Sequence, residues 1–276
     1  MKPSSDLTKL DTHFAFGRNW ASYAESITEV EITEAVAGLR RLLGGVDLAG
    51  LKFLDIGCGS GIHSLAALRL GAAEVVAIDF DPDSVATTRA VLERHAPSAR
   101  HRVEQASVLD LQTATMKAFD VVYSWGVLHH TGDMKGAIRA AARMVAPGGQ
   151  FVFALYRRTW CCPLWKQEKR WYSHASENAQ RRARAVYRFF FRLKFWSTGR
   201  SFKDYVATYK DNRGMDFEHD VHDWMGGYPY ESISPAIVDG FISDLGFRKV
   251  RAFAVDTRPM GMFGSGCDEY VYEQVQ

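Results

Sequence analysis

The sequence predicts an α/β fold, a doubly wound, mostly parallel β-sheet with helices on both faces. Three observations lead to it. Between residues 51 and 156, short apolar segments of strand length alternate with segments of helical periodicity. The first expected strand ends in a glycine-rich turn. Near the C-terminus, two strand-like segments follow each other without a helix between them. Strands joined in this way pair antiparallel, so we expect the parallel sheet to finish in a reversed strand.

The individual elements follow from the same patterns. The expected strands are residues 52–56, 74–79, 101–106, 119–124, 150–156, 247–255 and 267–275, and the expected helices between them are residues 61–71, 81–95, 134–145 and 234–246. Asp81 followed by Pro82 is typical of a helix start, and so is Ser234 followed by Pro235. The "PGG" at residues 147–149 indicates a turn before the fifth strand.

The alternation divides the chain into three parts. Residues 45–156 and 236–276 form the predicted core. Residues 157–235 are helical and loop-like, without a clear strand, and are expected to form a helical cap. Residues 1–44 indicate one or two helices outside the sheet, which we interpret as an N-terminal helical lid.

Composition excludes several classes of protein. The 276 residues are 47% hydrophobic with a formal net charge of +2, as expected of a folded globular protein. The first residues, "MKPSSDLTKLDTHF", lack the apolar core of a signal peptide, and no apolar run approaches the roughly 20 residues that span a bilayer. The four cysteines have neither zinc-ribbon nor disulfide-framework spacing. We therefore expect a cytoplasmic protein.

Three glycines mark the candidate ligand-binding turn, "FLDIGCGSG", at residues 53–61. Gly57, Gly59 and Gly61 permit positive φ and leave room for a ligand against the backbone. Asp79 ends the next expected strand, 22 residues after Gly57 (79 − 57), where a carboxylate can accept both hydroxyls of a ribose. The dinucleotide fingerprint needs its third glycine at position 62, which is Ile. This departure disfavours a nicotinamide cofactor.

In combination, four segments resemble the class I S-adenosylmethionine-dependent methyltransferases. These are "LDIGCGSG", "VVAIDFDP", "SVLDL" and "FDVVYSWGVLHHTGD…PGGQFVF", in family order and at family-like spacing. The resemblance covers residues 51–156 and 236–276, and it implies a Rossmann-like methyltransferase fold with a seven-stranded sheet and an antiparallel last strand. It also implies S-adenosyl-L-methionine as cofactor and S-adenosyl-L-homocysteine as product.

The resemblance carries over to individual positions. It implies that Asp55 and the three glycines lie along the methionine part of the cofactor. Asp79 would hold the ribose, with Phe80 against the adenine. The remaining cofactor contacts implied are Leu109 and Asp110 at the adenine edge, and Ser124 and Trp125 on the other side of the cofactor. For Asp110, capping of a short helix is the alternative interpretation.

Aromatic residues near the N-terminus could close over such a cofactor. Phe14, Phe16, Trp20 and Tyr23 occur at roughly helical spacing, and packing on the core is the simpler interpretation for most of them. A lid is the alternative, since aromatic faces attract a sulfonium and closure excludes water. Trp20 and Tyr23 are our preferred candidates for a lid, and Trp20 is the one that we assign to the cofactor.

Histidines are the candidate bases, because their unperturbed pKa of about 6.5 suits proton transfer at neutral pH. His129 and His130 follow the fourth strand, where the ligand crevice of such a sheet lies, but neighbouring residues cannot both face it. In "FEHDVHDWMGG", a carboxylate beside a histidine would make a competent base, so His222 and Asp223 are candidates too. A metal held by His219 and His222 is the weaker alternative, and we expect none.

The expected cap is strongly basic. Between Arg157 and Lys203 there are thirteen Lys or Arg residues and two acids. Within residues 177–196, the arginines at 181, 184, 188 and 192 fall on one helical side, and Ala183, Val186, Phe190 and Leu193 fall on the other. Three interpretations remain open: a solvated face over the core, a site for an anionic substrate, and peripheral contact with an anionic membrane.

These patterns favour methyl transfer to a small molecule, anionic or lipid-soluble, with a hydroxyl preferred over an amine as acceptor. The late segments "HDWMGGYPYE" and "GSGCDEYVYE" resemble bacterial quinol and sugar O-methyltransferases. A nucleic-acid substrate is disfavoured. The fourth strand is followed by "SWGV" and not by the Asp/Asn-Pro-Pro-aromatic motif of many methyltransferases that modify exocyclic base amines, and the net charge is near neutral. The alternatives are N-methylation, a nicotinamide-dependent oxidoreductase, and a non-catalytic cofactor-binding module that docks through its basic cap. The oligomeric state is not predicted.

Overall fold

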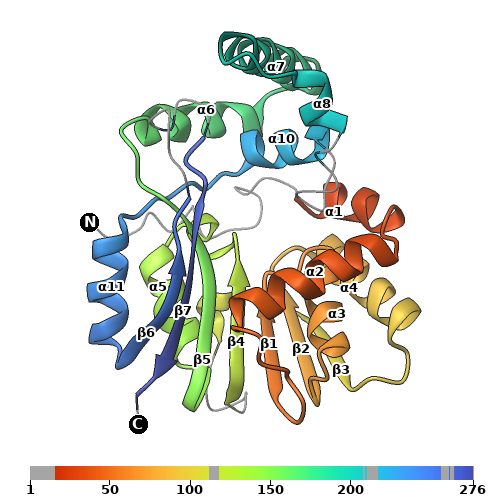
Figure 1. Cartoon of the computed structure of the whole chain (residues 1–276), viewed down its shortest axis with the longest axis vertical. Helices are drawn as coiled ribbons and strands as arrows, with labels where there is room; N and C mark the ends of the chain where they lie inside the picture. The colour runs from red at the N-terminus through yellow and green to blue at the C-terminus, as the bar shows by residue number, and fades with distance from the viewer. Residues whose placement is uncertain are drawn as a thin grey trace.

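The described residues form a seven-stranded sheet with helices on both faces (Figure 1). The computed structural model describes residues 16–111, 118–207, 209, 217–255, 261 and 264–275. The strands are β1 (Lys52–Ile56), β2 (Glu74–Asp79), β3 (His101–Gln105), β4 (Phe119–Trp125), β5 (Val145–Tyr156), β6 (Phe247–Phe253) and β7 (Cys267–Gln274), in the order β3-β2-β1-β4-β5-β7-β6. β7 runs antiparallel to both β5 and β6, which confirms the predicted fold class and the reversed last strand.

The two faces of the sheet are covered by different helices. On one face lie α2 (Glu29–Leu42), α3 (Ile62–Arg69) and α4 (Pro82–His95), and on the other lie α5 (Met134–Ala142) and α11 (Pro235–Asp244) (Figure 1). Alternate strand residues serve the two faces, as Phe53 packs with α2 and α3 while Leu54 packs with α5 and α11. Burial on both faces explains why the strands read as nearly continuous apolar runs.

The expected helix starts are present. Asp81 is the N-cap of α4, and its side chain accepts a hydrogen bond from the amide of Asp83, with Pro82 in the first turn. Ser234 occupies the N-cap position of α11, but its side chain makes no capping hydrogen bond. There Pro235 alone supplies the local preference for a helix start.

The "PGG" segment differs from its prediction as a turn before the strand. It lies inside β5, where the register with β4 shifts from Phe119–Val145 to Val121–Gln150. Gly148, with φ +73°, supplies a backbone conformation that other residues rarely adopt. The glycines therefore make an irregular stretch within one strand, and pairing resumes beyond them.

The cap lies above the carboxyl edge of the sheet (Figure 1). It contains α6 (Cys162–His174), α7 (Glu177–Ser197), α8 (Phe202–Ala207) and α10 (Phe217–Gly226). These helices have a small aromatic core of their own, made by Tyr172, Phe191, Phe195, Tyr209, Phe217, Val221 and Met225. The cap is thus a separate packing unit that continues from β5 and returns to the sheet through α11.

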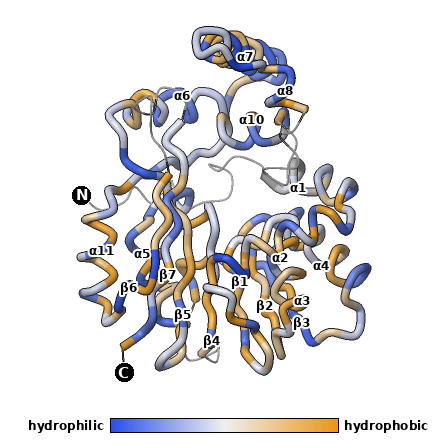
Figure 2. Tube along the Cα trace, viewed as in Figure 1, coloured by the Kyte–Doolittle hydropathy of each residue, from blue (hydrophilic) through white to orange (hydrophobic). Residues whose placement is uncertain are grey.

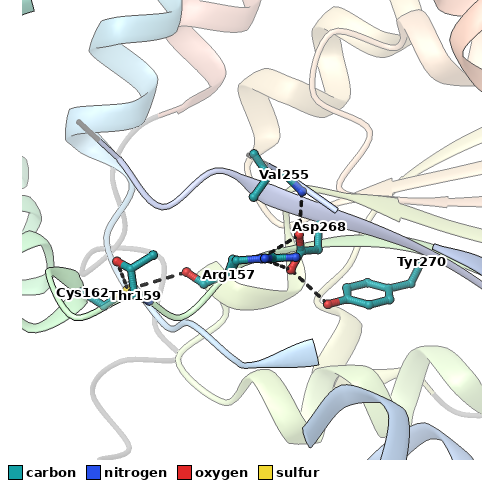
Figure 3. Close-up of polar contacts among 6 residues, drawn as sticks. All are labelled: Arg157, Thr159, Cys162, Val255, Asp268 and Tyr270. Carbon is teal, nitrogen blue, oxygen red and sulfur yellow. Dashed lines mark hydrogen bonds and ion pairs between the residues drawn. The ribbon is translucent and has the colours of Figure 1, made fainter. Parts of the chain in front are cut away.

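An ion pair fastens the chain where it leaves β5 for the cap (Figure 3). Arg157 Nε lies 2.8 Å from Oδ2 and 3.0 Å from Oδ1 of Asp268, a buried residue on β7. The amide of Val255 donates to the same carboxylate at 2.9 Å, and the Tyr270 hydroxyl donates at 3.3 Å. This set of donors compensates the buried charge and links the base of the cap to the end of the sheet.

The helix α1 (Phe16–Glu25) lies against α4. The amide of Gly17 donates to Asp81 Oδ2 at 2.9 Å. Phe14 lies outside the described residues, and so does the side chain of Phe16. In the described part of the chain, no helix has both the length and the apolar character needed to cross a membrane.

Candidate active site

The site is centred where β1 lies between β2 and β4. Successive crossovers diverge from this point, because β1 leads to β2 and β3 on one side while β4 and β5 lie on the other. In sheets of this kind the resulting crevice at the carboxyl edge binds ligands. The glycine turn after β1 and the carboxylate that ends β2 both lie at that edge.

All three glycines of the turn adopt positive φ, +78° for Gly57, +52° for Gly59 and +78° for Gly61. At Gly61 a Cβ would lie 2.9 Å from Cα of Thr88, a backbone atom of α4. At Gly57 it would lie 2.3 Å from Cγ2 of Val127. Two of the glycines therefore serve close packing of the turn against α4 and the segment after β4, in addition to their conformation.

Asp79 is bonded directly to the turn. Its Oδ2 accepts from the amide of Gly59 at 3.0 Å, and its Oδ1 accepts from the amide of Asp81 at 2.9 Å. Burial raises the pKa of Asp79 to about 6, while these backbone hydrogen bonds act in the opposite direction. The carboxylate is thus fixed beside the turn and is ionised at neutral pH.

Asp55 is buried beneath the turn. Its Oδ2 accepts a hydrogen bond of 2.6 Å from Ser64 in the first turn of α3. Burial raises the pKa of Asp55 to about 7, and the negative charge of Asp79 adds to the effect, while the Ser64 hydrogen bond opposes it. Two carboxylates close together and poor in counter-charge form a site that favours a ligand carrying positive charge or hydrogen-bond donors.

Trp20 lies over the glycine turn. A Cβ on Gly59 would come 3.2 Å from the indole Nε1 and Cε2 atoms. Tyr23, one helical turn later, meets Trp20 edge to face at a centroid distance of 6.0 Å and is buried in the core with α4. Of the two candidates for a lid, Trp20 is the one at the ligand turn, and Tyr23 is a core residue.

The residues expected at the adenine follow the carboxyl ends of β2 and β3. Phe80 follows β2 and is half-buried, and its carbonyl accepts from Gln105 at 3.2 Å. Leu109 and Asp110 belong to a short 3₁₀ helix, Val108–Asp110, where Ser107 is the capping residue. Asp110 is the exposed last residue of this short helix, and residues 112–117, where a helix capped by Asp110 would begin, lie outside the described residues.

Ser124 and Trp125 differ in their surroundings. The Ser124 side chain is buried and donates to the carbonyl of Ile56 at 3.0 Å, tying β4 to the end of β1. The Trp125 indole is exposed and donates to Glu269 at 2.9 Å. Glu269 also pairs with Arg41 at 2.7 Å. Ser124 therefore stiffens the crevice between β1 and β4, and Trp125 lies at its rim.

The two neighbouring histidines do not share an environment, as expected. His129 is fully buried, and neither ring nitrogen has a hydrogen-bonding partner among the described residues. Burial lowers the pKa of His129 well below its usual value; the positive charges of His130 and Lys169 add to this, and the Ala154 carbonyl partly offsets it. Its ring lies 4.0 Å from that of Tyr156, between centroids.

His130 has the geometry of an oriented base. Its Nδ1 lies 2.7 Å from the carbonyl oxygen of Pro229. A carbonyl only accepts, so Nδ1 carries the hydrogen, and in the neutral ring Nε2 is the atom that can take up a proton. Gly227 makes room for this ring, because a Cβ there would come 2.6 Å from Cε1 of His130.

His222 is engaged within the cap. Its Nδ1 lies 2.8 Å from Arg184 Nη1 and 2.7 Å from the Tyr172 hydroxyl. Arg184 can only donate, so Nδ1 is unprotonated and already accepts. Asp223, the next residue, is half-buried and acts electrostatically on Tyr156, Lys169 and Tyr172. Both residues belong to α10 and thus to the cap side of the molecule.

Among the described residues, no group of three or more His, Cys, Asp or Glu side chains is arranged to hold a metal ion. The side chain of His219, the other half of the weak metal alternative, lies outside the described residues.

The sequence patterns missed a cluster between the cap and the core. Lys169 of α6 is fully buried, with Nζ 4.0 Å from the ring centroid of Trp224 and 5.5 Å from that of Tyr230. Tyr156, at the end of β5, lies on the same cluster and contacts His129. Lys169 is one cation among thirteen in this part of the sequence, and nothing in the pattern distinguishes it.

A groove formed by cap residues lies elsewhere, on the outer side of the cap. It has a volume of about 540 Å³. Its lining includes Arg188, Arg192, Arg200 and Lys203 together with Trp196 and Phe202. Residues of α7, α8 and the start of α10 form this basic groove, and none of the glycine-turn residues lines it.

Comparison with known proteins agrees with this geometry. Residues 54–153, from β1 to β5, match the family model described as "Methyltransferase domain". Residues 54–153 are thus similar to a methyltransferase domain. The match confirms the resemblance inferred from the sequence motifs, and the matched segment contains the glycine turn, Asp79, Asp110 and the two histidines after β4.

Curated relatives share this part of the chain. The ubiquinone biosynthesis O-methyltransferase of Xanthomonas oryzae pv. oryzae is 39% identical over 114 residues, which are 41% of this chain and 46% of the relative. The corresponding protein of Xanthomonas euvesicatoria pv. vesicatoria is 37% identical over the same length. The chain therefore spans about half the length of the curated relatives it matches.

Solved structures share the fold over most of the chain. A magnesium protoporphyrin IX methyltransferase from Synechocystis, with S-adenosylhomocysteine bound, superposes with a TM-score of 0.54 at 14% identity, covering 89% of this chain and 84% of that one. An S-adenosylmethionine-dependent methyltransferase from Mesorhizobium loti gives 0.52 at 19% identity, covering 86% and 96%. At these identities the likeness concerns the fold alone.

Proposed function

We propose that this protein binds S-adenosyl-L-methionine and transfers its methyl group to a small molecule. The observation that carries the proposal is the bond between Gly59 and Asp79, which joins a positive-φ glycine turn to a carboxylate at the crevice of a methyltransferase domain. The proposed cofactor carries a ribose, an ammonium and a sulfonium. Its hydroxyls and positive charges suit the carboxylates of Asp55 and Asp79, and its sulfonium also suits the aromatic face of Trp20. Phe80, Leu109 and Asp110 would bind the adenine.

We favour a hydroxyl as the methyl acceptor. Methyl transfer is an in-line displacement at a carbon activated by the sulfonium, and a base helps when the nucleophile is a hydroxyl. His130 supports this assignment because Pro229 orients its ring and leaves Nε2 as the basic atom. His129 is buried with a lowered pKa, and the Nδ1 of His222 is engaged by Arg184, so both are weaker candidates. The O-methyltransferase relatives lend further support.

Calorimetric titration of S-adenosylhomocysteine, with NADH as the control ligand, tests the cofactor assignment. Micromolar binding of S-adenosylhomocysteine and no binding of NADH are expected. Transfer of radiolabelled methyl from S-adenosylmethionine into a cell extract then tests catalysis. A protein that binds the cofactor product and transfers no methyl group to any extract would favour the alternative of a non-catalytic binding module. O-methylation and N-methylation are distinguished by cation-exchange chromatography of the labelled product, because an N-methyl amine is retained as a cation and a neutral methyl ether is not.

A second proposed property is peripheral contact with an anionic membrane through α7. Five apolar side chains that fall on one side of the helix are exposed: Val186 by 55%, Phe189 by 57%, Phe190 by 54%, Leu193 by 43% and Trp196 by 81%. They lie opposite Phe191 and Phe195, which pack inside the cap.

Cations surround this exposed stripe. Arg181, Arg182 and Arg192 are exposed on the same helix, and the basic groove beside Trp196 adds Arg200 and Lys203. Figure 2 shows hydrophobic and hydrophilic segments side by side along α7, at the end of the molecule furthest from the sheet. An amphipathic basic helix of this kind suits the interface of a bilayer that contains anionic lipid. It would bring the enzyme to a lipid-soluble acceptor.

A further inference from the structure

Lys169 is a buried amine that contacts no counter-charge among the described residues. It is fully buried on α6, and Nζ has no hydrogen-bonding partner among the described residues. Burying an amine without a partner disfavours the folded state, and an ammonium disfavours it more. The position therefore brings no stability of its own, as is often the case for residues retained for ligand binding.

Aromatic rings surround Nζ, and they attract a cation without accepting a hydrogen bond from it. The nearest ring centroid, that of Trp224, lies at 4.0 Å, and those of Tyr230 and Tyr156 lie at 5.5 and 5.9 Å. Burial is the main influence and lowers the pKa of Lys169 below that of an exposed lysine. Glu168, Cys267 and Asp223 act in the opposite direction. Within the described part of the chain, the Glu168 carboxylate also has no hydrogen-bonding partner, and burial raises its pKa.

A second unpartnered side chain flanks the same tyrosine. His129, from the core, has its ring 4.0 Å from that of Tyr156, and neither of its nitrogens has a partner at ordinary hydrogen-bond geometry among the described residues. Tyr156 ends β5 at the carboxyl edge of the sheet. The segment that carries His129 begins beside the glycine turn, since a Cβ on Gly57 would touch Val127. The cluster is thus on the acceptor side of the expected cofactor.

We propose that Lys169 binds an anionic oxygen of the methyl acceptor in a site between α6, α10 and the end of β5. This inference rests on the proposed methyltransferase function. The oxygen supplies the counter-charge that Nζ lacks, and it belongs either to the ionised acceptor hydroxyl or to a carboxylate elsewhere on the acceptor. Because Nζ is enclosed, the acceptor reaches it only when α6 moves away from the core.

Anion binding is measured by calorimetry on protein saturated with S-adenosylhomocysteine. The probes are benzoate, which has a fixed carboxylate, and 4-nitrophenol, which has an ionisable hydroxyl. The proteins are wild type, Lys169→Met, Lys169→Arg and, as the matched control, Lys166→Met, which removes an exposed lysine from the same helix. Titration in two buffers of different ionisation enthalpy reports the protons taken up.

Wild type and Lys166→Met are expected to bind at least one probe. Benzoate is already an anion, so its binding should be accompanied by proton uptake that restores the charge of Lys169. Neutral 4-nitrophenol would instead pass its own hydroxyl proton to Nζ, without net uptake. Lys169→Met should bind at least ~10-fold more weakly, without proton uptake. Lys169→Arg should retain part of the affinity without proton uptake, since a guanidinium is always charged. Preference for benzoate or for 4-nitrophenol identifies which oxygen Lys169 binds.

Three results would overturn the proposal. The first is equal affinity of wild type and Lys169→Met for the probes. The second is wild type that binds S-adenosylhomocysteine but neither probe at millimolar concentration. The third is a melting temperature of Lys169→Met lower than that of wild type by more than about 4 °C, which would make the lysine structural. Failure of wild type to bind S-adenosylhomocysteine would instead count against the proposed function, and the same samples report it separately.

Discussion

The amide of Gly59 donates to Asp79 Oδ2 at 3.0 Å, so the glycine turn after β1 and the carboxylate that ends β2 form one unit. The other carboxylate oxygen accepts from Asp81 at 2.9 Å. Each oxygen thus has a fixed backbone donor and retains lone pairs toward the crevice. A ligand that hydrogen-bonds to Asp79 is thereby held at a defined position relative to the turn.

Replacing Asp79 with Asn should weaken S-adenosylhomocysteine binding by roughly 10- to 100-fold, the loss expected for charged hydrogen bonds. The amide nitrogen of Asn would face a backbone N–H where the carboxylate accepts one. Calorimetry measures the effect, with Glu74→Gln at the opposite end of β2 as the control. Wild-type affinity should also fall as pH drops below about 6, where Asp79 becomes protonated. Equal affinity of Asp79→Asn and wild type would contradict the ribose assignment.

Replacing Asp55 with Asn should stabilise the free protein at neutral pH while weakening cofactor binding. The pKa of Asp55 is raised from 3.8 to about 7, so the folded state holds a proton that the unfolded state releases. The resulting destabilisation, on the order of a few kcal/mol, is fully present above about pH 7 and decreases as pH falls toward 3.8. Asn retains an oxygen that can accept from Ser64.

Thermal melting of wild type and Asp55→Asn from pH 4.5 to 8 checks this sign. The advantage of the variant should be largest at pH 8 and should shrink toward pH 4.5. A constant difference across this range, or one that grows as the pH falls, would show that Asp55 is not the titrating group.

Much of the cofactor side was open to prediction because it is local in sequence. The three glycines, Asp79 and the start of α4 follow one another at short spacing, and backbone conformation and capping determine their arrangement. The fold class, the reversed last strand and the methyltransferase domain are confirmed. The roles of the individual residues toward cofactor and acceptor remain predictions.

The acceptor side depended on contacts between distant segments, which periodicity does not contain. Aromatic residues encircle α7, so the pattern could not decide which face is buried. Val186, Phe190 and Leu193 formed the expected apolar side, yet they are exposed, while Phe191 and Phe195 are buried. In the same way, Lys169 became distinctive only when α6 packed against Tyr156 and Trp224.

Replacing Gly61 with Ala should destabilise the protein more than the same change at Gly45. Both have positive φ, +78° and +85°, so each variant carries the strain of a side chain in that region, about 1 kcal/mol. A Cβ at Gly61 would also meet Cα of Thr88 at 2.9 Å, while at Gly45 nothing lies within 4 Å. Urea unfolding measures the two free energies. Equal losses of unfolding free energy in the two variants would mean that α4 accommodates the methyl group without further destabilisation.

Removing the apolar stripe of α7 should abolish membrane contact without affecting the cofactor. The test variant is Phe189→Ser with Trp196→Ser, and Ile237→Ser on α11, also exposed, is the control. Each large side chain that enters the bilayer contributes about 1.5–3 kcal/mol, so co-sedimentation with vesicles of equal parts phosphatidylcholine and phosphatidylglycerol should fall at least ~10-fold.

Added salt should weaken wild-type binding, because it screens the arginines. Binding of S-adenosylhomocysteine should be unchanged in the variant, which shows that it is folded. If the double variant sediments with the vesicles as wild type does, α7 is not the contact surface.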